Sequence, residues 1–201
     1  MAVSQKHPTP VFFVSHGSTM MLGEESEPAA IWKEMGDEAT RRGVKSIVMM
    51  GAHWEALGDE IQVAMNPNPQ QTPVAYVAPK RYKNFVLSPD LVLGSKVLSM
   101  LQSAGFEAKA NPVLDFIHDT FLILIRMFPH MQTCIPVTVI SANARFDPHY
   151  HAKVGSVLRP LRYENILIIG SGGAVHNLYR NHWAQMVIHR DNFAQPVPPA
   201  P

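Results

Sequence analysis

Short apolar runs alternate along the chain with stretches in which apolar residues recur at helical spacing. The runs rich in β-forming residues predict four buried strands, at Pro10–Ser15, Ser46–Met50, Ile135–Ser141 and Asn165–Gly170. The helical spacing predicts four helices, at Glu27–Arg42, Ser88–Ser103, His118–Met127 and Asp147–Leu161. This alternation is typical of a single α/β domain with a mostly parallel central sheet and helices on both of its faces.

The ends of these elements carry recognisable signals. Gly43 and Gly105 predict glycine stops, and Ser88 and Asp147 are expected as N-caps because a proline follows each of them. Two further strands are expected at residues 60–65, with one face exposed to solvent, and at residues 106–110. We expect one domain over residues 1–194, followed by a proline-rich tail at residues 195–201.

Composition narrows the class of protein. Of the 201 residues 46% are hydrophobic and 16% are charged, which is enough apolar material for a sizeable core. The net charge of +1 gives no support for a nucleic-acid or membrane-surface partner. The single cysteine, Cys134, excludes an intramolecular disulfide, and the chain has no apolar run long enough to span a membrane. We also expect no signal peptide, because the first ten residues lack an apolar segment. We therefore expect a cytoplasmic globular protein.

The placement of the histidines is the most informative feature of the sequence. His16, His53 and His176 each follow one of the predicted buried strands, and His118 opens a predicted helix just before Asp119. Ligands of α/β proteins bind beyond the carboxyl ends of the strands, and imidazole suits both metal binding and proton transfer. A lone histidine is more often a surface or a satisfied core residue, so on geometry alone the functional and structural interpretations stay open. The other histidines are expected at the surface: His7, His130, His149, His151, His182 and His189.

Gly170–Gly173 follows a predicted strand but has neither the spacing of a dinucleotide loop nor that of a phosphate loop. Ser171 is also outside the pattern of a hydrolase nucleophile. We expect this segment to form a tight turn that lets the backbone come close to a ligand bound beyond the carboxyl ends of the strands.

Four segments together resemble the LigB-type extradiol dioxygenase superfamily, in particular its 4,5-DOPA extradiol dioxygenase-like branch. They are FFVSHGS at residues 12–18, GAHWE at 51–55, IHDTF at 117–121 and GSGGAVHNL at 170–178. The resemblance implies one Fe(II) or Zn(II) per chain, a small catechol-like aromatic substrate, and O2 as co-substrate. Thr19 departs from the branch, which usually has proline at this position.

The resemblance also implies roles for the four histidines. His16 and His53 match the two metal-binding histidines of the family. His176 matches the acid/base histidine, which is a metal ligand in some members, and His118 matches a further active-site histidine. The family's third metal ligand lies in a C-terminal segment that has no counterpart in these residues. The third ligand therefore stays open among His118, Glu55, His182, His189 and a residue of a second subunit, with a homo-oligomer as one expectation.

Three functions remain as alternatives. The first is an active metal-dependent ring-cleaving dioxygenase. The second is a truncated paralogue with little or no activity that acts as a binding or partner protein. The third is a zinc-dependent hydrolase that uses a metal-activated water. Retention of all four histidines favours the first alternative, and the short C-terminus favours the second.

Overall fold

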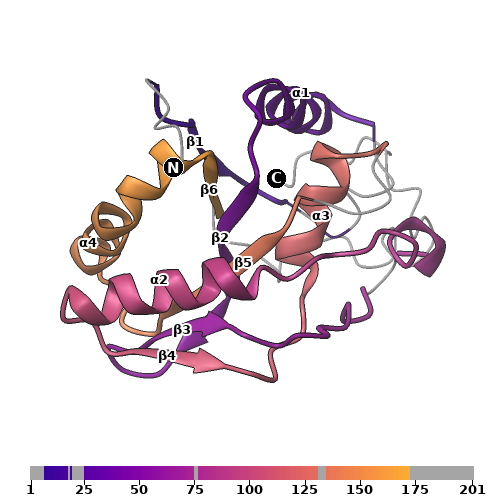
Figure 1. Cartoon of the computed structure of the whole chain (residues 1–201). Coiled ribbons are helices and arrows are strands. Elements are labelled where there is room, and N and C mark those ends of the chain that lie inside the picture. Colours follow the sequence, from indigo (N-terminus) through magenta and orange to yellow (C-terminus); the bar gives the residue numbers. More distant parts are fainter. Residues whose placement is uncertain (1–6, 18, 20–24, 75–76, 131–134, 173–201) are drawn as a thin grey trace, which may run out of the picture.

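The computed structural model describes residues 7–17, 19, 25–74, 77–130 and 135–172. These residues form a central sheet between two layers of helices (Figure 1). The strands are β1 (Val11–Val14), β2 (Ser46–Ala56), β3 (Ile61–Ala64), β4 (Ala108–Asn111), β5 (Val137–Asn143) and β6 (Ile166–Ser171). The helices are α1 (Glu27–Arg41), α2 (Leu91–Ser103), α3 (His118–Met127) and α4 (Pro148–Leu158), with short 3-10 helices η2 (Pro79–Arg81) and η3 (Arg159–Glu164).

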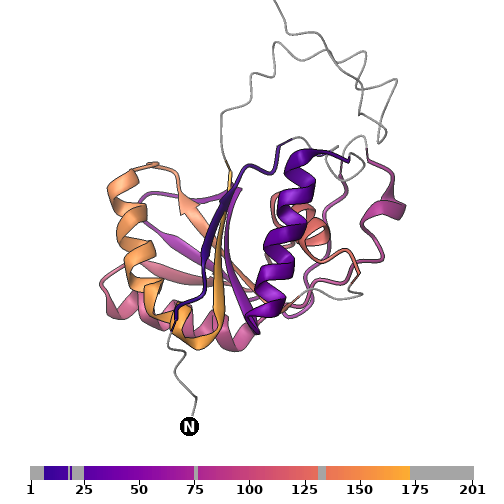
Figure 2. The same ribbon diagram turned by 90° about the horizontal axis from the view of Figure 1, so that it is seen from above.

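The six strands lie in the order β1-β6-β2-β5-β3-β4, and neighbours are parallel except for β3 and β5. The connection between β2 and β3 is a short turn around Gly58, and it reverses the direction of the chain. β3 therefore runs antiparallel to β5, because a parallel strand would need a longer crossover connection. Figure 2 shows β1 and β6 side by side, with α4 on one side and α1 on the other. The expected α/β fold with a mostly parallel, doubly covered sheet is confirmed.

Local capping explains where the helices begin. In α1 the Ser26 side chain accepts a hydrogen bond from the Ala29 amide, and in α4 Asp147 caps as expected. The expected start of α2 at Ser88 is wrong, because Asp90 is the N-cap. The Ser88 carbonyl instead accepts a hydrogen bond from the Val137 amide at 2.8 Å, so this segment pairs with the start of β5 before the helix begins.

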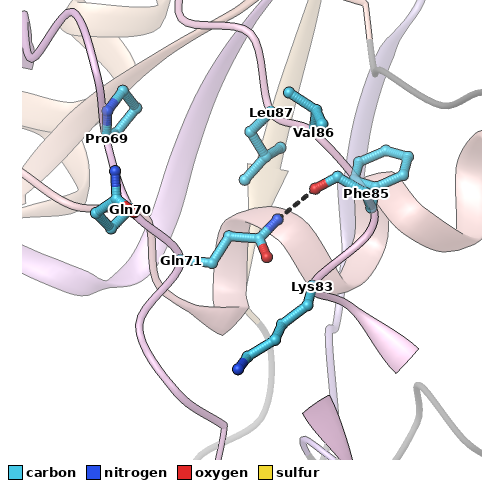
Figure 3. Close-up of a pocket in the computed structure, with 7 residues that line it drawn as sticks. All are labelled: Pro69, Gln70, Gln71, Lys83, Phe85, Val86 and Leu87. Carbon is cyan, nitrogen blue, oxygen red and sulfur yellow. Dashed lines mark hydrogen bonds between the residues drawn. The ribbon is translucent and has the colours of Figure 1, made fainter. Parts of the chain in front are cut away.

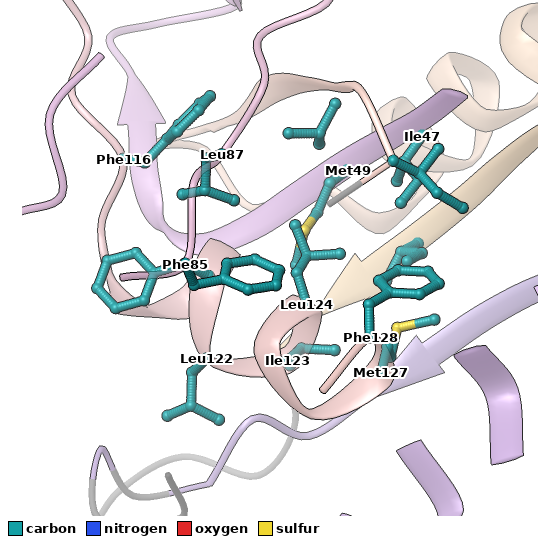
Figure 4. Close-up of a cluster of buried hydrophobic side chains, with 14 of the residues drawn as sticks. Ile47, Met49, Phe85, Leu87, Phe116, Leu122, Ile123, Leu124, Met127 and Phe128 are labelled. Carbon is teal, nitrogen blue, oxygen red and sulfur yellow. The ribbon is translucent and has the colours of Figure 1, made fainter. Parts of the chain in front are cut away.

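Two apolar clusters fill the space on the two faces of the sheet. Figure 4 shows the larger cluster, in which α3 packs against β2 and against the loop that precedes α2. Phe121 and Leu124 of this cluster are fully buried. The second cluster joins α2 and α4 to the other face. Burial of α3 on nearly every side holds its first turn, which carries His118, against the sheet.

The edge strand β1 differs from the buried strand that its composition predicts. Val11 is 51% exposed and Phe13 is 75% exposed, because β1 pairs only with β6 within the described part of the chain. The expected solvent-exposed face of β3 is only partly present, since Ile61 and Val63 are buried and Gln62 is half-buried.

No described helix has the length and apolar character needed to cross a bilayer. The expected tail at residues 195–201 lies outside the described residues.

Candidate metal centre

Three of the four predicted site histidines come together in the described structure. His16 follows β1, His53 lies near the carboxyl end of β2, and His118 is the first residue of α3. One ring nitrogen from each lies within 4.8 Å of the others. The ring centroids are 5.2 Å apart for His16 and His53, 5.6 Å for His16 and His118, and 4.9 Å for His53 and His118.

The topology of the sheet explains why residues so distant in sequence converge. β1 and β2 both run parallel to β6, which lies between them, so their carboxyl ends meet at one edge. The register between β2 and β5 shifts between Met50 and Glu55, and His53 lies within this irregular stretch. Such irregularities change the direction of a side chain relative to the regular strand.

The contacts of His16 suit a metal ligand. Its side chain is buried, and its Nδ1 lies 3.0 Å from the Ser171 hydroxyl oxygen. In the tautomer with the proton on Nδ1, the ring donates to Ser171 and the Nε2 lone pair is directed at His53. Orientation of a ligating histidine through its other ring nitrogen is common at metal sites. Sequence reasoning expected only a turn at Ser171 and missed this contact.

The spacing of the nitrogens also fits a shared cation. The Nε2 atoms of His16 and His53 are 3.2 Å apart. Two imidazole nitrogens bound to one tetrahedral zinc ion at about 2.05 Å lie about 3.3 Å from each other. This spacing fits His16 and His53 as ligands of one ion. With His118 the nitrogens lie within 4.8 Å of one another, and both Zn(II) and Fe(II) accept imidazole nitrogen.

A buried carboxylate lies directly beside the three histidines. Asp119 is 1% exposed, and its Oδ2 accepts a hydrogen bond from the His53 backbone N–H at 2.9 Å. Its Oδ1 accepts a hydrogen bond from the Thr120 hydroxyl at 3.2 Å. Nothing in the linear sequence indicates that a residue of α3 binds the backbone of β2, so sequence reasoning missed this contact too.

The other residues predicted for the site are either outside the described part of the chain or away from the three histidines. His176, His182 and His189 lie outside the described residues, although β6, the strand that leads to His176, lies between β1 and β2. Glu55 is exposed and is not part of the group that could hold a metal. Of the histidines expected at the surface, His7, His130 and His149 are exposed, and His151 is half-buried.

A separate cavity of about 390 Å³ lies in the loop between β3 and α2 (Figure 3). Gln71, Lys83 and Leu87 are among its lining residues, and the three histidines are not. The cavity wall is joined to the approach to α3, because the Phe116 amide donates to the Gln70 carbonyl at 2.9 Å. The loop is thus anchored two residues before His118.

Comparison with known proteins agrees with the resemblance of the four segments. The family model "Catalytic LigB subunit of aromatic ring-opening dioxygenase" matches residues 10–194. Relatives named 4,5-DOPA dioxygenase extradiol include those of Beta vulgaris (30% identical, 82% of this chain and 62% of that protein) and Portulaca grandiflora (32% identical, 82% and 61%). Another is that of Escherichia coli K12 (27% identical, 87% and 62%). The chain spans about three-fifths of the length of these curated relatives. Because the family model covers nearly all of the chain, the protein belongs to the LigB family of aromatic ring-opening dioxygenases.

Proposed function

We propose that the protein is a metal-dependent extradiol dioxygenase that opens the ring of a small catechol-like aromatic with O2. The observation that carries this proposal is the convergence of His16, His53 and His118 at the carboxyl edge of the sheet. The relatives named 4,5-DOPA dioxygenase extradiol support the reaction class and make a catechol the first substrate class to test.

His16 and His53 are the proposed ligands of one Fe(II) or Zn(II) per chain. Their neutral rings supply nitrogen lone pairs, and Ser171 and Asp119 hold them in place from behind. A bound metal would supply Lewis acidity, which lowers the pKa of a catechol hydroxyl. Of the third-ligand candidates, His118 is favoured because its ring lies within reach of the same point.

His176 is the proposed acid/base. Its imidazole would accept a proton from a catechol hydroxyl and later return it to the opening product. The position of β6 between β1 and β2 supports this role, because a short segment after β6 begins at the edge where the three histidines meet. His176 also remains a candidate metal ligand, in competition with His118.

The test combines metal content with oxygen uptake. Protein purified without oxygen is loaded with Fe(II) or Zn(II), and metal per chain is measured for the wild type and for His118→Ala and His176→Ala. We expect about one metal per chain in the wild type, its loss in His118→Ala, and its retention with little turnover in His176→Ala. Metal loss in His176→Ala alone would transfer the third-ligand role to that residue.

Oxygen uptake on a panel of catechols, DOPA included, then tests the reaction. We expect one O2 to be consumed for each ring opened. A metal-loaded protein that consumes no O2 on any catechol would contradict the proposal; ester or amide hydrolysis by the zinc form would then support a hydrolase. A folded protein that retains no metal would support a binding or partner function. Light scattering on the same samples tests the expected homo-oligomer.

A further inference from the structure

Asp119 is an unusual residue to find in this part of the core. Its carboxylate is buried at the start of α3, and the neighbouring buried residues of that helix are mainly apolar. Its hydrogen bonds come from the His53 backbone N–H and the Thr120 hydroxyl, both of which are neutral donors. Within the described part of the chain no lysine or arginine forms an ion pair with it. Burial of a carboxylate without a cationic partner is costly, and the position of Asp119 in the first turn of α3, where the helix dipole favours an acidic side chain, offsets only part of this cost.

The space for this carboxylate comes from a glycine on the neighbouring strand. A Cβ added to Gly51 of β2 would lie 2.4 Å from Oδ2, 2.8 Å from Cγ and 3.0 Å from Oδ1 of Asp119. Residue 51 therefore cannot carry a side chain while the carboxylate keeps its position. The missing side chain lets α3 approach β2 closely enough for the hydrogen bond to His53 to form.

The two contacts tie together two ligands of the candidate centre. Asp119 follows His118 directly in α3, and it holds His53 through that residue's backbone N–H. A displacement of the carboxylate would therefore change the distance between the two imidazoles. The negative charge also lies next to the point where a divalent cation would add positive charge, so a bound metal would offset the cost of its burial.

We propose that Asp119, seated in the space left by Gly51, is a positioning residue that holds His53 and His118 at metal-binding distance and raises the affinity of the centre for a divalent cation. The proposal rests on the metal centre proposed above. It assigns a role to a residue that contacts the backbone of a ligand and not the metal itself.

The experiment compares Asp119→Ala and Asp119→Asn with the control Asp37→Asn, an exposed aspartate on α1. Zinc affinity is measured by competition with a chromophoric chelator, and exchange of the His53 amide is measured by NMR in the metal-free proteins. We expect Asp119→Ala to lose about 10- to 100-fold in zinc affinity, the range for partners behind a metal ligand. Its His53 amide should also exchange faster. Asp119→Asn keeps an acceptor oxygen, so it should protect the amide while losing part of the zinc affinity, and Asp37→Asn should match the wild type.

Gly51→Ala provides a second test that leaves the carboxylate in the protein. The added methyl group should displace Asp119 and lower zinc affinity in the wild-type background, but have much less effect in the Asp119→Ala background. Circular dichroism establishes that each variant is folded; if Asp119→Ala does not fold, Asp119→Asn and Gly51→Ala decide the question. Folded variants with wild-type zinc affinity and wild-type His53 exchange would overturn the proposal.

Wild-type protein that binds neither zinc nor Fe(II) would instead contradict the metal centre itself. In that case the His53 amide still decides the positioning role: unchanged exchange in Asp119→Ala overturns it, and faster exchange supports it.

Discussion

His151 follows β5, and His53 of the candidate centre lies near the carboxyl end of the adjacent strand β2, yet the surroundings of the two histidines differ. His151 is in the first turn of α4, which follows β5, and its Nδ1 lies 2.7 Å from the Asp147 carbonyl oxygen. Its Nε2 accepts a hydrogen bond from the Asn143 backbone N–H at 3.2 Å. Both ring nitrogens of His151 are thus engaged by the backbone. His16, in contrast, uses Nδ1 for the Ser171 side chain and directs Nε2 at a second imidazole.

The difference shows what separates a structural histidine from a candidate ligand. A metal ion needs a nitrogen lone pair. In His151 the Nε2 lone pair already accepts the hydrogen bond from the Asn143 N–H, and a metal bound there would leave that buried N–H without an acceptor. In the candidate centre one nitrogen of each ring lies within 4.8 Å of a nitrogen of each of the other two imidazoles. Whether a histidine can bind a metal therefore depends more on the partner of its Nε2 atom than on its position at the edge of the sheet.

The largest expected effect comes from removing a ligand. His16→Ala and His53→Ala should each lower zinc affinity by more than about 100-fold, beyond the loss typical of an outer partner. Both variants should keep a native circular dichroism spectrum, because the apolar clusters are untouched. Chelator competition measures the affinity. Wild-type zinc affinity in both variants would show that the candidate centre, like His151, does not bind the metal.

His151→Ala should act on stability and leave metal binding alone. The Asn143 N–H loses its acceptor, and an unsatisfied buried donor costs about 1–3 kcal/mol of unfolding free energy. Urea denaturation of the metal-free protein measures this loss, and zinc affinity should stay at the wild-type value. The exposed His149→Ala is the matched control and should change stability by less than about 0.5 kcal/mol. A loss of zinc affinity in His151→Ala would place that residue in the centre.

Ser171→Ala tests whether the hydrogen bond at the Nδ1 atom of His16 contributes to metal binding at the candidate centre. Without the hydroxyl, the His16 ring loses the contact at its Nδ1, and zinc affinity should fall by about 10-fold. Ser156→Ala, an exposed serine on α4, is the control. Equal affinities in the wild type and Ser171→Ala would show that the burial of His16, and not this hydrogen bond, sets its orientation.

The smallest effect concerns Tyr150, beside His151. Burial and then the charge of Asp59 raise the pKa of the Tyr150 hydroxyl, which donates a hydrogen bond to the Asp59 carbonyl. Because the pKa in the folded state is raised above the unfolded value of about 10, the stabilisation is complete below that pH and is lost as the pH rises through the folded pKa. Unfolding free energy should therefore fall more steeply above about pH 10 in the wild type than in Tyr150→Phe. Parallel pH profiles would contradict this assignment.

Local signals in the sequence were sufficient for most of the architecture. The bounds of α3 and the glycine stops at Gly43 and Gly105 agree with the structure, because periodicity and backbone conformation are properties of short segments. The start of α2 was wrong because a contact between the Ser88 carbonyl and β5 overrode the cap signal. Edge exposure of β1 was also missed, since composition does not reveal strand order.

The sequence by itself determined the fold class, the family resemblance and the histidines worth testing, because each of these depends on short motifs and their order. Only the tertiary structure decided that His118 lies with His16 and His53, that His151 is bound by backbone groups, and that Asp119 occupies the space above Gly51. These outcomes depend on the packing of α3 and α4 against particular strands. Such packing joins residues far apart in the chain, and no local pattern of the sequence encodes it.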